Sequence, residues 1–230
     1  MLLNITELMG TRLAALDGEI GRIQDAYFDG ALWVIRYLIA DTGSWLSGRR
    51  VLLTPHSFGR LDQFEKILHL KLSRKRIEES PPVSPHQTVS RHDEIDHYRH
   101  YGWPAYWNGD SLWGADSHPS VPPQPAYRTD QHLGRRRRTD EGLKSAKAIT
   151  GHSVQTIDGV AGRVSGFLVD DRSWAMREIV VEAPSDRASG KILISTTKVA
   201  GIQSEKSNVF VNLAMADIQR IGVIGRTPTA

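Results

Sequence analysis

One stretch of the chain holds side chains whose types and spacing could bind a metal ion. If it is helical, Asp93, His97 and His100 share one face, because they are four and three residues apart. Carboxylates and imidazoles on one face can hold a metal for hydrolysis or for structure. A polar helix face beside packed aromatic residues explains the same pattern without a metal. We therefore expect no metal site and no cofactor, and a metal-dependent enzyme that uses the cluster from His92 to His100 is the third alternative.

A run of four arginines could bind a polyanion. Basic clusters bind nucleic acid through its phosphates, and near an anionic membrane each basic residue contributes about 1 kcal/mol. The run consists of Arg135, Arg136, Arg137 and Arg138. Acidic residues flank it at positions 130, 140 and 141, and a run of this kind in a linker is commonly a solvated spacer. Nucleic-acid binding is therefore an alternative to protein binding.

Aromatic residues cluster shortly before this run. The cluster comprises Trp103, Tyr106, Trp107 and Trp113. Such rings could stack on single-stranded bases or cover an apolar surface of the protein itself. Disordered segments are poor in aromatic residues. We therefore expect a short helix at about residues 91–101, followed by an aromatic strap that packs on the protein or at a dimer interface. These four residues and the four arginines are the candidate partner-binding residues.

These features lie between two copies of one sequence pattern. Residues 17–23, DGEIGRI, recur 141 residues later as DGVAGRV, and the same offset pairs Trp33 with Trp174. A fixed offset of this kind indicates two copies of one small domain. We expect a first domain at residues 1–80 and a connector at 81–142 that is rich in proline, histidine and tryptophan. The second domain is expected at 143–224 and a tail at 225–230.

The repeated motif favours a structural role. Each copy has an Asp-Gly pair between apolar runs, which indicates a tight hairpin turn, and a glycine inside the next strand, which indicates a bulge or a sharp bend. Neither copy has the lysine and Ser or Thr of a phosphate-binding loop. The arginine after the glycine has no repeated acid-base partner, so we expect it to form a salt bridge or to hydrogen-bond a loop carbonyl. The motif consists of Gly10, Asp17, Gly18, Gly21 and Arg22 in the first copy and Gly151, Asp158, Gly159, Gly162 and Arg163 in the second.

Each copy is predicted to be mainly β. Strands are expected at residues 11–15, 19–28, 32–40, 50–54 and 67–72, and again at 152–156, 160–169, 175–182, 191–195 and 209–213. A short helix follows each copy. Ser73 is the expected N-cap of the first helix, and the second lies at about residues 215–221. The bent strands predict two tandem small, highly bent β-barrels joined by a partly ordered connector.

The motif resembles the PRC-barrel family, named after the photosynthetic reaction centre. The resemblance rests on Gly10, the Asp-Gly turn, Gly21 with Arg22, the apolar third strand and the strand at 51–54, and it covers about residues 1–80 and 143–222. It implies a small bent barrel, as in the reaction-centre H subunit and in a ribosome-maturation factor, and a tendency to bind proteins. The connector is similar to that of tandem PRC-barrel proteins of bacteria. The resemblance implies no catalytic residue.

Composition narrows the class of function. The 230 residues include 29 basic and 26 acidic side chains and no cysteine, which excludes disulfides and a cysteine nucleophile. The longest apolar run, residues 33–40, contains Arg36 and is far shorter than the roughly 20 residues of a membrane-spanning helix. The first residues lack a secretory signal pattern. We expect a dimeric, non-enzymatic cytoplasmic adaptor for a protein partner, with the cytoplasmic membrane face as a further location. An RNA- or ribosome-associated role is the alternative, with strong salt dependence.

Overall fold

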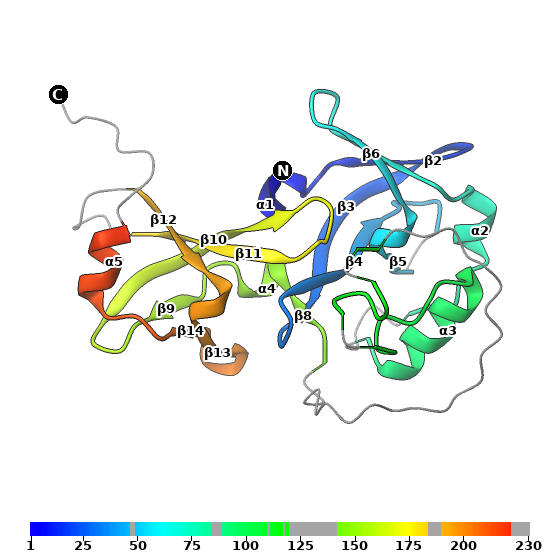
Figure 1. Cartoon of the computed structure of the whole chain (residues 1–230). Helices are drawn as coiled ribbons and strands as arrows, with labels where there is room; N and C mark the ends of the chain where they lie inside the picture. Colours follow the sequence, from blue (N-terminus) through cyan, green and yellow to red (C-terminus); the bar gives the residue numbers. More distant parts are fainter. Residues whose placement is uncertain are drawn as a thin grey trace.

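The computed structural model describes residues 1–46, 49–83, 89–109, 111–116, 118–119, 142–183 and 190–221 (Figure 1). In the first repeat the elements are β1 (Leu2–Asn4), α1 (Ile5–Leu8), β2 (Arg12–Ala15), β3 (Gly18–Asp29), β4 (Val34–Asp41), β5 (Val51–Leu53), η1 (Pro55–Ser57), β6 (Phe58–Asp62), β7 (Ile67–Leu70) and α2 (Arg74–Glu78). Helix α3 (Arg91–Tyr101) follows in the connector. The arginine run and the predicted tail lie outside the described residues.

The second repeat has the same order of elements. They are β8 (Lys144–Ser145), α4 (Ala146–Ile149), β9 (Ser153–Gln155), β10 (Val160–Asp170), β11 (Met176–Glu182), β12 (Lys191–Ser195), η3 (Thr196–Lys198), β13 (Val199–Gln203), η4 (Ser204–Lys206), β14 (Asn208–Val211) and α5 (Met215–Ile221). No helix within the described ranges is both long and apolar enough to cross a membrane.

The internal repeat predicted from the sequence is present in three dimensions. Helices α1 and α4 begin 141 residues apart, and so do η1 and η3, β6 and β13, and α2 and α5. Unusual backbone conformations recur as well. Trp33 and Trp174 have φ angles of 54° and 56°, and Lys66 and Ser207 both have φ of 52°. The two copies therefore share their local geometry as well as their residue pattern.

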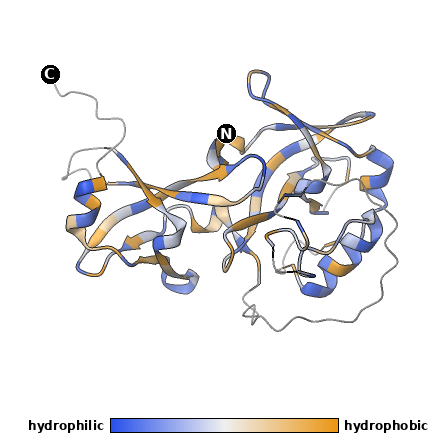
Figure 2. Cartoon of the chain, viewed as in Figure 1, coloured by the Kyte–Doolittle hydropathy of each residue, from blue (hydrophilic) through white to orange (hydrophobic). Residues whose placement is uncertain are grey.

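Each repeat is built around one mixed sheet of seven strands. The first sheet has the order β5-β4-β3-β2-β7-β6, with β2 and β7 parallel and the other pairs antiparallel. The second has the order β12-β11-β10-β9-β14-β13. Apolar residues are concentrated on the strands, and α3 is largely hydrophilic (Figure 2). The mainly β prediction is confirmed.

The predicted closure into barrels is not found. Among the described residues, β5 and β6 end the pairing order of the first sheet and do not pair with each other, and the same holds for β12 and β13. The reason lies between β5 and β6. Strand β5 is only three residues long, and Pro55, which has no N–H to donate, then begins the 3-10 turn η1. The chain leaves the ladder there, so each repeat is an open sheet with free edges.

The repeated glycine makes a close approach that a side chain would prevent. Gly21 has φ of 136°, and a Cβ at this position would overlap the carbonyl oxygen of Asp41. The equivalent Gly162 has φ of 149°, and its Cβ would overlap the carbonyl oxygen of Glu182. The pairing of β2 with β3 shifts in register beside Gly21, and β9 with β10 beside Gly162. The predicted bulge is therefore present in both repeats.

The polar motif residues bind nearby backbone. The Nη1 of Arg22 donates to the carbonyl oxygen of Gly10 at 3.1 Å, as predicted, and the second repeat repeats this bond at 3.1 Å. The Oδ1 of Asp17 accepts from the backbone N–H of Arg74 at 2.6 Å, and its counterpart is at 2.7 Å. Each hairpin turn is thereby tied to the start of a helix. In the second repeat, Arg163 donates to the carbonyl oxygen of Gly151, and Asp158 accepts from the backbone N–H of Met215.

The two repeats are joined by an exchange of edge strands. Strand β1 of the first repeat pairs with β10, and β8 of the second pairs with β3. Between them, Val34 and Ala175 form an antiparallel bridge. On either side, a backbone N–H donates across the junction to a tryptophan carbonyl, at 2.9 Å to Trp174 and at 2.7 Å to Trp33. Because equivalent residues meet, the junction has the pattern of a two-fold dimer interface.

The helices predicted at 91–101 and 215–221 are confirmed, and so is the N-cap, because the Ser73 side chain accepts from the backbone N–H of Arg76 at 3.3 Å. All ten predicted strands are found, most of them with shifted ends. The short helices and strands β1, α1, β6, β8, α4 and β13 were not predicted, and neither were the 3-10 turns η1, η3 and η4. Strands β1 and β8 pair with the opposite repeat, so no local pattern identifies them.

The close approach at Gly21 predicts a large loss of stability on substitution. We expect Gly21→Ala to lower the free energy of unfolding by about 3 kcal/mol or more, because strain at positive φ adds to overlap with the Asp41 carbonyl. Gly10→Ala is the control, since its φ of 78° is also positive but a Cβ meets nothing within 4 Å. It should cost about 1 kcal/mol. Urea denaturation measures both, and equal losses would contradict the close approach.

Candidate functional site

The connector contributes an ordered strap, which we define as described residues 89–116. Helix α3 begins with a reciprocal capping box formed by Ser90 and Asp93. It ends at Gly102 in the left-handed conformation with φ of 70°. The strap packs on the first repeat beside β4 and β5 (Figure 1). The ordered helix with packed aromatic residues is as predicted.

The four aromatic candidates lie in this strap. Tyr106 and Trp113 are each 1% exposed, and Trp103 and Trp107 are half-buried. The indole Nε1 of Trp113 donates to the backbone oxygen of Ser173 at 2.7 Å, so the strap also contacts the second repeat. Tyr106 and Trp113 are enclosed within the chain. Of the four aromatic candidates, only Trp103 and Trp107 are exposed enough to contact a partner. The four arginine candidates lie outside the described residues.

A buried carboxylate fixes the strap to the first sheet. Glu94 is 3% exposed and accepts hydrogen bonds from the hydroxyls of Tyr106 at 2.6 Å and Tyr37 at 3.2 Å. It also forms an ion pair with Arg91 at 2.7 Å. Burial raises the pKa of Glu94, and Arg91 acts in the opposite direction. The carboxylate has three hydrogen-bonding partners and almost no exposed surface, so its role is structural.

Arg36 is the second buried charge of the cluster. Its side chain is fully buried, and its guanidinium carbon lies 3.8 Å from the ring centroid of Tyr106 and 4.9 Å from that of Trp113. Nη1 donates to the carbonyl oxygen of Leu112 at 2.6 Å, and Nη2 lies 3.6 Å from the carboxylate of Asp29. Arg36 therefore links the strap to the end of β3.

The three residues proposed to share a metal do not converge. Asp93 caps α3, His97 is 1% exposed, and the Nε2 of His100 lies 3.0 Å from the backbone oxygen of Arg76. Within the described part of the chain, no group of three or more His, Asp or Glu side chains could hold a metal ion. The helical spacing was predicted correctly, but each side chain has a separate use.

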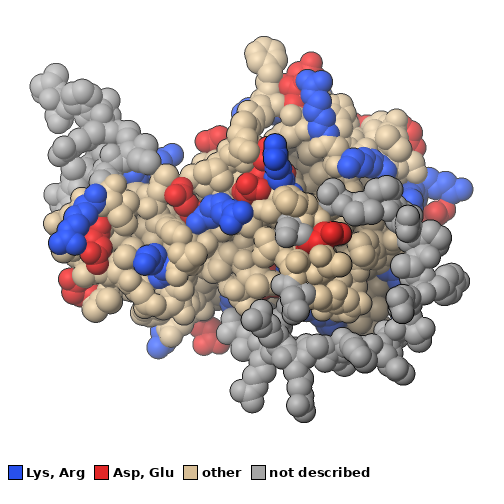
Figure 3. Space-filling model, viewed as in Figure 1, with Lys and Arg blue, Asp and Glu red and all other residues tan. Residues whose placement is uncertain are grey.

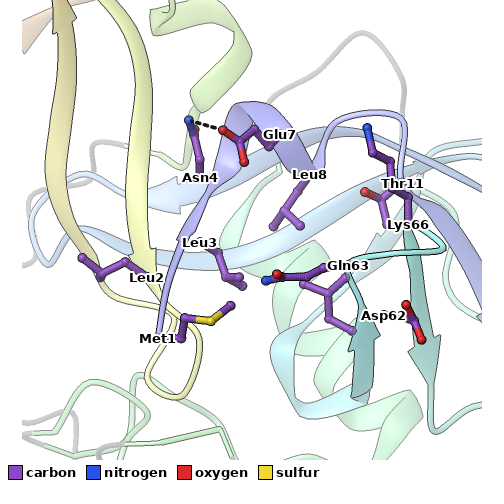
Figure 4. Close-up of a pocket in the computed structure, with 11 residues that line it drawn as sticks. Met1, Leu2, Leu3, Asn4, Glu7, Leu8, Thr11, Asp62, Gln63 and Lys66 are labelled. Atoms are coloured by element: carbon purple, nitrogen blue, oxygen red, sulfur yellow. Dashed lines mark hydrogen bonds between the residues drawn. The ribbon is translucent and has the colours of Figure 1, made fainter. Parts of the chain in front are cut away.

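The surface is hollowed along edge strand β6. The wide hollow, of about 580 Å³, lies between the β1–α1 segment and the hairpin of β6 and β7 (Figure 4). Leu3, Leu8 and Gln63 point into it, and Glu7 and Lys66 also line it. Its wall therefore combines apolar side chains with polar ones and carries charges of both signs. All of its lining residues belong to the first repeat, and its β1 wall is held in place by pairing with β10 of the second.

A narrow hollow of about 300 Å³ continues along the same strand. Phe58 and Trp174 form its apolar part, with ring centroids 4.7 Å apart. Gly59 contributes a stretch of edge backbone, and Lys71 and Arg172 add two cations. This hollow combines an apolar floor, a sheet edge and positive charge, which is the chemistry of a site for an acidic extended segment.

A related hollow of about 530 Å³ lies at the other side of the junction. It is formed by the turn after β3, including Trp33, and by edge strand β13. Most of its residues correspond by the offset of 141 to those of the narrow hollow, but Arg172 is replaced by Ala31. The residue equivalent to Lys71 is Asn212, which does not line this hollow, and Lys144 contributes a cation at the position of Leu3. The two cations are therefore a feature of the first-repeat hollow and are not required by the fold.

The sequence reasoning did not identify these hollows. Many of their residues lie in the short strands β1, β6 and β13 and in the turns after β3 and β10. Short strands and turns have weak sequence patterns. One signal was available in the sequence. Phe64 interrupts the polar run from Asp62 to Lys66, and the second repeat has Glu205 at the same place. The two repeats therefore differ in chemistry at this position.

The enclosed carboxylate predicts a large stability loss on neutralisation. Glu94→Gln should lower the free energy of unfolding by about 3 kcal/mol, because it removes the charge that pairs with Arg91 and replaces one acceptor oxygen by an NH2 donor among groups that also donate. Asp96→Asn, on the exposed face of α3, should change it by less than about 0.5 kcal/mol. Thermal unfolding compares the two, and equal losses would show that Glu94 is not enclosed by the strap.

Two buried histidines predict acid sensitivity. Burial lowers the pKa of His97 to about 3 and that of His56 to about 4. A lowered folded pKa means that the unfolded chain binds more protons, so stability is complete above about pH 6.5 and falls as pH decreases toward the folded values. The slope is about 1.4 kcal/mol per pH unit for each histidine. The pKa of Glu94 is raised in the folded chain, so its protonation as pH decreases through its titration range adds stability and opposes the effect of the histidines.

The contribution of His97 can be isolated by substitution. His97→Phe keeps a ring between Tyr37 and Tyr101 but removes the titrating group. Denaturation between pH 7 and 5 should then show about half of the wild-type decrease in stability. An unchanged pH slope would contradict the burial of this imidazole.

No known family model matches the chain, and no curated protein is similar to it.

Proposed function

We propose that the chain is a non-enzymatic adaptor of the PRC-barrel type, which holds a segment of a protein partner in the narrow hollow. The observation that carries this proposal is a sheet edge that borders an open, cationic hollow. Strand β6 is the last strand of its sheet and is not paired on its outer side within the described residues. Edge strands present backbone N–H and C=O groups that an extended peptide can bind.

The charges of the hollow favour an acidic segment. Lys71 and Arg172 line it together with Asp171, whose carboxylate lies 2.7 Å from the amino group of Met1. The carboxylate is therefore neutralised within the chain, and the two cations set the net charge of the site. An extended segment with Asp or Glu side chains is the partner of matching chemistry.

The buried cluster supports a binding role over catalysis. Glu94 is 3% exposed and Arg36 is fully buried, and both are enclosed by the strap. A catalytic group must come within hydrogen-bonding distance of a substrate. The accessible hollows instead carry apolar side chains, backbone and separated charges. We place the adaptor in the cytoplasm, with the cytoplasmic membrane face as a further location.

Charge reversal in the hollow tests the proposal. The double variant Lys71→Glu with Arg172→Glu is compared with wild type and with Lys198→Glu combined with Lys206→Glu, which changes the net charge equally on the exposed second repeat. Proteins retained from ribonuclease-treated lysate of the source organism are identified by mass spectrometry. We expect a defined set that the control retains and that the hollow variant loses at least about tenfold, since repulsion replaces attraction.

Two results would contradict the adaptor proposal. Equal recovery by all three proteins would mean that the narrow hollow is not the binding site. If untreated lysate yields mainly RNA or ribosomal protein, and this material is lost at high salt or when Arg135 to Arg138 are alanine, the RNA-associated alternative takes its place.

A further inference from the structure

Phe64 is held away from the protein at the tip of the β6–β7 hairpin. It is 98% exposed, and the hairpin projects from the molecule (Figure 1). The tip is well defined, because the Oδ1 of Asp62 accepts from the backbone N–H groups of Phe64 at 3.1 Å and Glu65 at 3.0 Å. Lys66 follows in the left-handed conformation. The aromatic ring is therefore presented by a specific turn.

The second repeat shows that the fold does not require this ring. Its equivalent hairpin has the same left-handed residue, Ser207 in place of Lys66, with φ of 52° at both. The residue equivalent to Phe64 is Glu205. A charged side chain is thus compatible with this tip, and the aromatic side chain gains nothing from the chain that carries it. Large exposed aromatic side chains are typical anchors of protein interfaces.

The wide hollow lies directly beside this hairpin. Leu61, Gln63 and Lys66 of the hairpin region form one of its walls, and Leu3 and Leu8 form the apolar part opposite (Figure 4). A projecting ring and a hollow of about 580 Å³ with an apolar part formed by Leu3 and Leu8 therefore share one face of the molecule. When a projection and its matching hollow are neighbours, one two-fold rotation satisfies both at once.

We propose that two copies of the chain associate about a two-fold axis, with Phe64 of each copy inserted into the wide hollow of the other. The charges fit this arrangement. Arg60 and Lys66 balance Asp62 and Glu65 on the hairpin, and acidic and basic side chains are interspersed around it (Figure 3). Rotation about a two-fold axis can place the basic side chains of one copy opposite the acidic side chains of the other. Mixed charge gives no attraction to an anionic lipid surface, so a second copy is favoured over a membrane.

Sedimentation equilibrium from about 1 to 200 µM tests the dimer. Wild type should show a reversible monomer-dimer equilibrium, and Phe64→Glu, which copies the second repeat, should weaken it at least about a hundredfold because two anchors are lost. Glu205→Ala is the matched control and should leave the dimer constant unchanged. The thermal midpoints of all three monomers should agree, since the tip residue contacts nothing in its own chain.

A mixing experiment distinguishes insertion from any other effect of Phe64. Leu61→Glu places a charge in the hollow and should also weaken the homodimer. A mixture of Phe64→Glu and Leu61→Glu retains one intact ring-hollow contact, so the heterodimer should form more tightly than either homodimer. The proposal is overturned if wild type stays monomeric at 200 µM, if Phe64→Glu dimerises as wild type does, or if mixing gives no heterodimer. Binding of monomeric wild type, but not Phe64→Glu, to phosphatidylcholine and phosphatidylserine vesicles would assign Phe64 to a membrane instead.

Discussion

The reciprocal pairing of β1 with β10 and of β8 with β3 is the interaction on which the rest of the structure depends. Each repeat completes its sheet with a strand from the other, so neither sheet is whole without the junction. The bridge between Val34 and Ala175 lies at the centre of this arrangement. The tryptophans beside it adopt positive φ, which costs about 1 to 3 kcal/mol each, and their carbonyls accept hydrogen bonds from the opposite repeat.

The junction also creates the hollows. A segment that crosses to the opposite sheet leaves space between itself and the edge strand of its own repeat, and this space appears on both sides of the two-fold relation. Function then depends on how the repeats have diverged. The narrow hollow carries Lys71 and Arg172, whereas the equivalent residues are Asn212 and Ala31, and the hairpin tip has an aromatic residue in the first repeat and a glutamate in the second.

Divergence on β4 and β11 explains why the strap covers one repeat. Arg36 and Tyr37 bind the strap, and the equivalent residues are Arg177, which is exposed, and Glu178. His56, which packs against three aromatic rings of the strap, corresponds to exposed Thr197. The second sheet therefore keeps a polar surface at the place where the first has an enclosed cluster. The architecture is symmetric, but the chemistry is not.

Local patterns predicted most of the fold, because glycine, proline and apolar alternation act over a few residues. Gly21 and Ser73 show this, since their roles depend on neighbouring backbone. The open sheets and the hollows could not be predicted in the same way. They depend on pairing between residues such as Leu3 and Val169, which are distant in the sequence. The helical spacing of His97 and His100 was predicted, but their burial depends on the sheet beneath them.

The most direct test of the account is a disulfide across the strand exchange. Leu3 and Val169 are paired directly in β1 and β10, and the chain has no cysteine of its own. Paired positions on antiparallel strands are within the range of a disulfide. The variant with cysteine at both positions should oxidise within one chain and keep the wild-type fold. Absence of the bridge, or bridges formed only between chains, would contradict the exchange of edge strands within the chain.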